Sequence, residues 1–135
     1  MIKRYSKKAK FEDVLEDLKL AIEARGLVID FHSHIHRMLE RTGKDVGSDR
    51  KIYADAQAFV FCSASLSRKT MEADAANIAL CPYSIVVYAK ADEPEKVYVA
   101  YESPVRADSN VRSQVALKEV DKLLDDIARE ALGVK

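Results

Sequence analysis

The sequence predicts an α+β fold in which two long helices pack on one face of a largely antiparallel sheet of about five strands. Two observations lead to this prediction: helical spacing of apolar residues near each end of the chain, and, between them, short apolar or alternating segments separated by turn residues. The predicted order is strand, helix, strand, short helix, strand, short helix, hairpin and helix. A chain of 135 residues is long enough to bury its own core, so we expect one domain over residues 1–135.

The first half of the chain predicts two strands and two helices. Residues 2–8 form a short polar strand for a sheet edge, and an amphipathic helix follows and ends at Gly26. The apolar residues of this helix are Phe11, Val14, Leu15, Leu18 and Ile22. Residues 27–35 alternate, which predicts a strand with Leu27, Ile29, Phe31 and Ile35 on one face and Val28, Asp30, His32 and His34 on the other. A short helix is expected to begin near residues 34–36 and to stop at Gly43.

The second half predicts three further strands and two helices. After a polar loop over residues 44–54, residues 57–62 are apolar and aromatic, as is typical of a strand. Ser65 is expected to cap a short helix that runs to about Asp74. Pro82 predicts the start of the next strand, and residues 84–88 and 97–101 predict a hairpin around a loop over residues 90–96. The last helix carries Val120, Leu123, Leu124, Ile127 and Ala131 on one stripe.

Composition and charge are those of an ordinary globular protein. Lysine plus arginine and aspartate plus glutamate both number 22, so the net charge is zero, and nucleic-acid binding, which depends on neutralising phosphates, is disfavoured. The N-terminus lacks the apolar core of a secretory signal, and no apolar run approaches the roughly 20 residues that span a bilayer. We therefore expect no membrane association. Two cysteines without an export signal favour a reducing, cytoplasmic location and free thiols.

Several segments occur in an order that identifies a family. They are Phe11–Val14, Gly26–Asp30, Met38–Gly43, Phe61–Ala64, Met71–Asp74, Leu80–Tyr88 and Val97–Tyr101. Together they resemble the domain-of-unknown-function 302 (DUF302) family over nearly the whole chain. The resemblance implies a TATA-box-binding-protein-like fold with a sheet curved around the long helices, and a homodimer, but no catalytic residues. Members of this family place a cysteine directly after the proline of the fourth strand, where this chain has Tyr83, so no family role carries over to Cys81.

Cys62 and Cys81 are the candidate catalytic residues. If the third and fourth strands were parallel, the two thiols would lie at opposite ends of the sheet, but the antiparallel meander implied by the resemblance places them at the same end. Cys62 precedes a helix N-terminus, where the dipole favours a thiolate, whereas Cys81 follows Ile78 and Leu80 and is expected to be more buried. The alternative is that both are small buried hydrophobic residues.

His32, His34 and His36 are weak candidates for metal ligands. On a continued strand all three would project from one face and could share a divalent metal. If a helix has begun by Ser33, the set splays apart and only His32 and His36 approach each other. The switch to helical spacing at Ile35 favours the second geometry, so no metal site is expected.

Aromatic residues on the central strands are candidates for a ligand site or an interface. They are Phe59, Phe61, Tyr83, Tyr88, Tyr98 and Tyr101. Alternation directs about half of them into the core and the other half onto the open face of the sheet, where a dimer interface is favoured over a ligand cavity. With only four glycines and no phosphate-binding loop or nucleophile elbow, no cofactor is expected.

The sequence leaves two classes of function. The first, which it favours, is a dimeric, non-catalytic accessory module that holds a small apolar ligand or a protein partner against its sheet. The second is a thiol-dependent redox or sulfur-transfer protein that uses Cys62 and Cys81.

Overall fold

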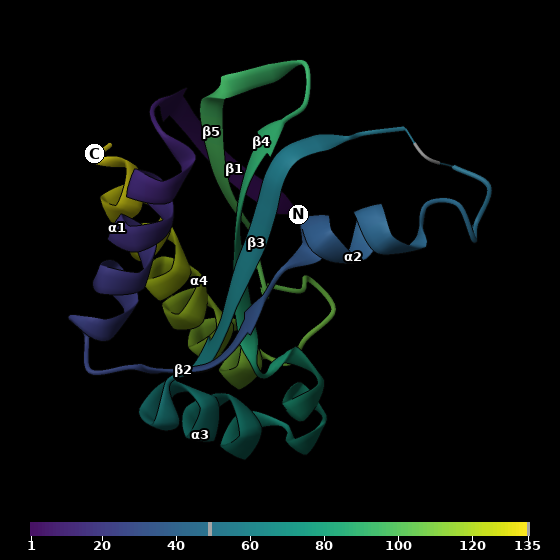
Figure 1. The fold of residues 1–135 in the computed structure, drawn as a ribbon. Helices are drawn as coiled ribbons and strands as arrows, with labels where there is room; N and C mark the ends of the chain where they lie inside the picture. The colour runs from purple at the N-terminus through teal and green to yellow at the C-terminus, as the bar shows by residue number, and fades with distance from the viewer. Residues whose placement is uncertain (49, 135) are drawn as a thin grey trace.

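The computed structural model describes residues 1–48 and 50–134, in which one five-stranded sheet is packed against helices (Figure 1). The strands are β1 (Ile2–Lys8), β2 (Val28–Ser33), β3 (Tyr53–Cys62), β4 (Tyr83–Lys90) and β5 (Glu93–Glu102). The helices are α1 (Phe11–Glu23), α2 (Ile35–Thr42), α3 (Ala64–Ala73), α4 (Val111–Leu132) and a 3₁₀ helix, η1 (Ala75–Leu80). The strand order is β1-β5-β4-β3-β2 with every neighbouring pair antiparallel, which confirms the predicted α+β class.

The core lies between one face of the sheet and the two long helices, α1 and α4 (Figure 1). The predicted apolar stripes supply it: Val14, Leu18 and Ile22 from α1, and Val120 and Ile127 from α4, are almost fully buried. Each such side chain contributes about 1.5–3 kcal/mol when it leaves water. The sheet supplies Phe61, Ile85, Val87, Val97 and Val99 from alternate positions of its central strands.

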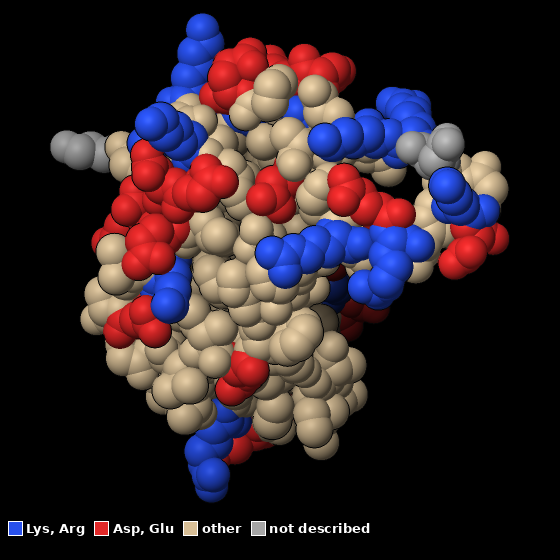
Figure 2. All heavy atoms as spheres, viewed as in Figure 1, with Lys and Arg blue, Asp and Glu red and all other residues tan. Residues whose placement is uncertain are grey.

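The opposite face of the sheet is only partly covered. Figure 1 shows α2 on the other side of β3 from α1 and α4. Because α2 packs on this strand, Ala56 and Ala58 are buried although they alternate with the core residues. α3 and η1 lie across one end of the sheet (Figure 1). Figure 2 shows acidic side chains gathered over α1 and basic ones over α2 and the loop after it, so neither charge dominates this view.

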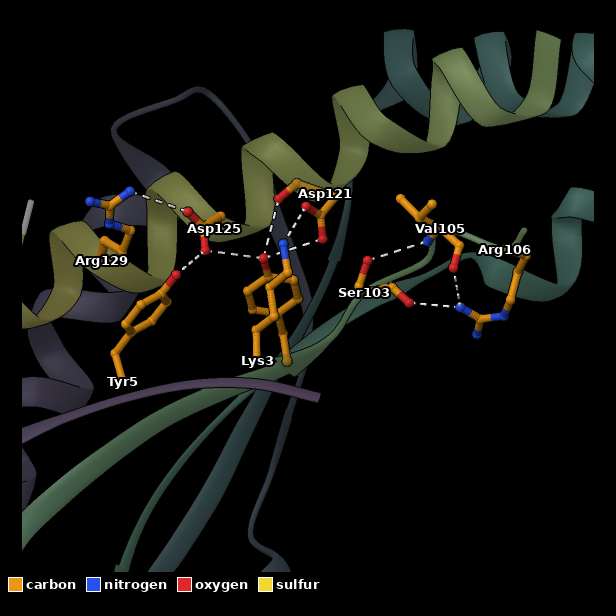
Figure 3. Close-up of polar contacts among 9 residues, drawn as sticks. Lys3, Tyr5, Ser103, Val105, Arg106, Asp121, Asp125 and Arg129 are labelled. Carbon is orange, nitrogen blue, oxygen red and sulfur yellow. Dashed lines mark hydrogen bonds and ion pairs between the residues drawn. The ribbon is translucent and has the colours of Figure 1, made fainter. Parts of the chain in front are cut away.

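Polar side chains tie the edge strand β1 to the middle of α4 (Figure 3). Lys3 Nζ donates to Oδ2 of Asp121 at 2.8 Å, and the Tyr5 hydroxyl donates to Oδ1 of Asp125. Arg129 completes the group from α4, with Nη1 3.4 Å from Oδ2 of Asp125. These contacts stabilise β1, which lies at the edge of the sheet and pairs with β5 alone among the described strands.

The predicted alternation of residues 27–35 is wrong beyond Ile29, because β2 contains a bulge. Ile29 pairs with Phe61, yet Phe31 pairs with Val60, so the register shifts at Asp30. An extra residue in one strand reverses the faces of those that follow. Phe31 is therefore 60% exposed on the open face, and His32 lies on the helix-covered face beside Phe59.

Three element boundaries also differ from the prediction. β3 begins at Tyr53, inside the predicted loop, and the hairpin turn is Ala91–Asp92, so Pro94 lies within β5. Pro94 is tolerated there because β1 first pairs with β5 at Lys96, so the missing N–H costs no ladder bond. The cap of α3 is Ser63, not Ser65.

None of the helices in the described residues combines the length and apolar character that a membrane crossing requires.

Candidate functional site

The two cysteines meet at the end of the sheet next to α3. Cys62 is the last residue of β3, and Cys81 stands two residues before β4. Because β3 and β4 are antiparallel neighbours and Phe61 pairs with Tyr83, the two sulfur atoms lie at the same end, 2.7 Å apart. This confirms the predicted placement. Both cysteines are free thiols and half-buried, so the expected greater burial of Cys81 is not seen.

Ser67 of α3 joins the cysteine pair to Tyr83. Its Oγ lies 3.6 Å from Sγ of Cys81 and 3.0 Å from the hydroxyl of Tyr83. Ser67 and Tyr83 are both buried. Sequence reasoning missed Ser67, because no local spacing signals its contact with Cys81, which depends on how α3 packs at this end of the sheet.

Local hydrogen bonds fix α3 and η1 around this site. Ser63 caps α3, since its Oγ accepts from the backbone N–H of Leu66. Asn77 of η1 donates from Nδ2 to the carbonyl of Thr70 and to Oγ of Ser113 in α4. The segment that leads into Cys81 is thus held against two helices.

The protonation of Cys62 differs from the prediction. Burial raises the pKa of Cys62 to about 11, and the hydrogen bond and charge of Cys81 act in the same direction, against smaller lowering by Ser67 and the backbone of Tyr83. Desolvation and a neighbouring sulfur therefore outweigh the helix dipole, and Cys62 keeps its proton at neutral pH. Burial likewise raises the pKa of Tyr83, which stays a neutral phenol.

The histidines adopt a geometry that sequence reasoning did not predict. His32 and His34 stack with ring centroids 4.4 Å apart, because β2 continues to Ser33 and α2 begins only at Ile35. His36, expected to approach His32, instead lies 3.1 Å from Oε1 of Glu40. Among residues 1–48 and 50–134 no three His, Cys, Asp or Glu side chains gather as a metal site would require.

His32 and His34 differ in their hydrogen bonds. His32 Nε2 lies 2.6 Å from Oε1 of Gln57. Nδ1 of His34 is buried without a hydrogen-bond partner. Burial, followed by the charges of His32 and Arg37, lowers the pKa of His34 below its usual range.

The aromatic candidates divide unequally between the two faces of the sheet. Phe59, Phe61, Tyr83 and Tyr101 are buried in the core. Only Tyr88 and Tyr98 lie on the open face, where their rings stack nearly parallel with centroids 4.8 Å apart. The expectation that half would be exposed is therefore wrong.

A hollow of about 420 Å³ lies on the open face beside η1. Its floor includes Val86 and Ala100, and Leu80 and Pro82, the neighbours of Cys81, form one wall. Arg106 lies at its edge, where Nη1 donates to the carbonyl oxygen of Ser103 at 2.7 Å. Ser84 and Glu102 also line the hollow, so it offers both apolar and polar surface to a small molecule.

The antiparallel sheet, with two long helices on one face and a cysteine pair at one end, defines an α+β protein. The family model described as "Domain of unknown function DUF302" matches residues 2–131, so the chain belongs to the DUF302 family. No curated protein matches it. It is similar to the crystal structure of an uncharacterized conserved DUF302 protein from Bacillus stearothermophilus, with a TM-score of 0.79 and 12% identity over 96% of this chain and 97% of that chain. At that identity the likeness establishes the fold alone.

Proposed function

We propose that this chain is a thiol-dependent redox protein in which Cys62 and Cys81 alternate between a dithiol and an intramolecular disulfide. The observation that carries the proposal is the contact of the two sulfur atoms at 2.7 Å, between residues 19 positions apart in the sequence. Oxidation can join them with only local movement. The fold gives each thiol a fixed place, since one ends β3 and the other is held by η1.

The reaction balances with a disulfide as the oxidant. The two thiols lose two protons and two electrons and form one S–S bond, while the S–S bond of the oxidant breaks and yields two thiols. A second dithiol would reverse the reaction and reset the protein.

The test is oxidation of the purified, reduced protein with glutathione disulfide, followed by removal of the reagent. We expect an intact mass two hydrogen atoms lower and complete loss of alkylation at both cysteines. The controls are Cys62→Ser and Cys81→Ser, each of which should retain one glutathione as a mixed disulfide. If the unaltered protein keeps both thiols alkylatable, or retains glutathione, the proposal is wrong.

A second candidate function is that of an accessory module with a binding site on the open face of the sheet. The partly apolar hollow beside η1 and the stacked Tyr88 and Tyr98 favour it, since aromatics and apolar surface are enriched in binding patches. In this proposal the chain is a homodimer that takes a small apolar ligand or a protein partner and binds neither nucleic acid nor membranes. A native mass spectrum of protein from its own host would test it: a retained ligand or a dimer supports it, and a bare 15.1 kDa species contradicts it.

A further inference from the structure

The bulge at Asp30 places His32 on the helix-covered face of the sheet. Alternation from Ile29 would otherwise turn this side chain to the open face. Its ring packs against Phe59, with centroids 4.6 Å apart, and against His34, with centroids 4.4 Å apart. The bulge thus brings an imidazole to the margin of the core.

Two side chains of β3 determine which nitrogen of His32 carries a proton. The carboxylate of Asp55 can only accept, and it already accepts from the backbone N–H of Ala56 at 2.8 Å. Nε2 of Gln57 lies 3.3 Å from both oxygens of Asp55, so the amide of Gln57 turns its nitrogen to Asp55 and its oxygen to His32. That oxygen can only accept, so Nε2 of His32, 2.6 Å away, is the donor.

The second nitrogen of His32 is available as an acceptor. A neutral imidazole carries one proton, so a proton on Nε2 leaves a lone pair on Nδ1. Within residues 1–48 and 50–134, only Nδ1 of His34 is both buried and without a hydrogen-bond partner. Nδ1 of His32 makes no hydrogen bond within those residues either, so it is accessible from outside.

His32 lines a hollow of about 690 Å³ between α1 and β2, called here the α1–β2 hollow. Apolar side chains form most of its inner wall: Leu15, Leu27, Ile29 and Phe59. Its volume is in the range of about 300–1,000 Å³ that small-molecule sites occupy. An acceptor of fixed orientation beside apolar walls is the arrangement by which such sites orient a ligand.

The charged residues of the α1–β2 hollow limit the class of ligand. Glu16, Lys19 and Glu23 line it from exposed positions of α1, so they lie at its mouth. Two carboxylates against one ammonium disfavour an anion, and a ligand carboxylate cannot donate to Nδ1 of His32. An ammonium group would have to leave water to reach His32 between apolar walls, which is costly. A hydroxyl group donates a hydrogen bond and carries no charge.

We infer that the α1–β2 hollow binds a small apolar molecule with one hydroxyl group, of the phenol or alcohol class, whose O–H donates to Nδ1 of His32. Gln57 and Asp55 act as positioning residues, because they hold the proton of His32 on the other nitrogen. The site lies on the opposite face of the sheet from the hollow beside η1 and uses neither cysteine. It is therefore independent of both proposed functions.

The test is a titration of the isotope-labelled protein with phenol and, separately, with toluene, which has the same shape but no hydroxyl. Amide chemical shifts should change chiefly in residues 15–23 and 26–32, and phenol should bind about threefold to tenfold more tightly than toluene, the effect of one net hydrogen bond. His32→Phe keeps a ring but removes the acceptor, so phenol should lose its advantage while toluene still binds. His36→Gln, which alters a histidine outside the hollow, should keep the advantage. Shift changes centred elsewhere, or phenol no tighter than toluene in the unaltered protein, overturn the inference.

The role of Gln57 is tested through the imidazole nitrogen signals of His32 near pH 8, which report the nitrogen that carries the proton. The unaltered protein should show the proton on Nε2, and Gln57→Leu should populate both arrangements and reduce the preference for phenol over toluene. A merely structural role would lower the melting temperature and leave the nitrogen signals unchanged. A proton on Nδ1 in the unaltered protein, or unchanged signals in Gln57→Leu, overturns the assignment of Gln57 and Asp55 as positioning residues.

Discussion

The hydroxyl of Tyr101 in β5 lies 3.2 Å from Oδ1 of Asp125 in α4. The hydroxyl of Tyr5 in β1 donates to the same oxygen of Asp125 (Figure 3). One carboxylate thus accepts from two strands, and its other oxygen lies 3.4 Å from Nη1 of Arg129. Burial and the charges of Asp121 and Asp125 raise the pKa of Tyr101, so it remains a donor over the whole range in which the protein is handled. This group fixes α4 to the sheet edge opposite β2.

Asp125→Ala should destabilise the fold by about 2 kcal/mol, because the hydroxyls of Tyr5 and Tyr101 lose a shared charged acceptor. Asp126→Ala is the matched control, since Asp126 is the next residue of α4 and pairs only with the exposed Lys122. It should cost less than about 0.5 kcal/mol. Urea unfolding of the three proteins measures both effects, and equal costs would contradict the role assigned to Asp125.

The pair of Lys3 and Asp121 predicts part of the acid sensitivity. Burial acts to raise the pKa of Asp121, but hydrogen bonds from Lys3, Ser103 and Tyr101 and the charge of Lys3 outweigh it, so the pKa is lowered. A carboxyl whose folded pKa is depressed contributes stability above its unfolded pKa, about 3.9, and loses that stability as pH falls through the folded value.

Lys3→Gln should therefore be less stable than the unaltered protein by about 1 kcal/mol at neutral pH, and the difference should shrink once Asp121 is protonated. Lys122→Gln, which removes an exposed partner of Asp126, should show almost no difference at either pH. The measurement is the urea midpoint at neutral pH and near pH 3. A gap that stays constant on acidification would show that Lys3 stabilises the fold by packing alone.

His34 predicts a second loss of stability nearer to neutrality. Because the pKa of His34 is lowered in the folded protein, the unfolded chain takes up the proton at a higher pH than the folded protein does. The free energy of unfolding is therefore greatest above the ordinary histidine pKa of about 6.5, and it decreases as pH falls from that value toward the folded pKa. His34→Gln should remove much of the decline between about pH 7.5 and about pH 5.5. His36→Gln, beside the exposed Glu40, should retain it. Urea midpoints at the two pH values check this, and an unchanged decline in His34→Gln would show that another group causes the loss of stability.

The long helices and the central strands were predictable because their burial is periodic. Residues such as Leu18 and Val120 recur at helical spacing, and Phe59 and Phe61 alternate, so pattern alone assigns them to the core. The meeting of Cys62 with Cys81 followed from the antiparallel order of two strands. The bulge at Asp30 and the contact of Ser67 with Cys81 could not be predicted, because each depends on how elements pack rather than on local spacing.

The bulge has a direct consequence for two residues that the sequence places on one face. Ile29 packs against the core, whereas Phe31 is 60% exposed. Ile29→Ala should cost about 2 kcal/mol and Phe31→Ala less than about 0.5 kcal/mol. Urea unfolding distinguishes them, and equal costs would indicate a strand without the bulge.

The cap of α3 gives a last test, in which sequence and structure make opposite predictions. The sequence assigned the cap to Ser65, but the Oγ of Ser63 accepts from the N–H of Leu66, and Ser65 is exposed within the first turn. Ser63→Ala should therefore destabilise the protein by about 1 kcal/mol, because a helix N–H loses its acceptor, whereas Ser65→Ala should be close to neutral. Both changes remove one hydroxyl from nearby positions, so composition and size are matched.

The same change should also be visible near the cysteines, because Ser67 lies on this helix. Ser63→Ala should make the Ser67 side chain beside Cys81 more mobile and increase amide hydrogen exchange across the first turn of α3. A larger loss of stability for Ser65→Ala would place the start of the helix two residues later and move Ser67 away from the cysteine pair.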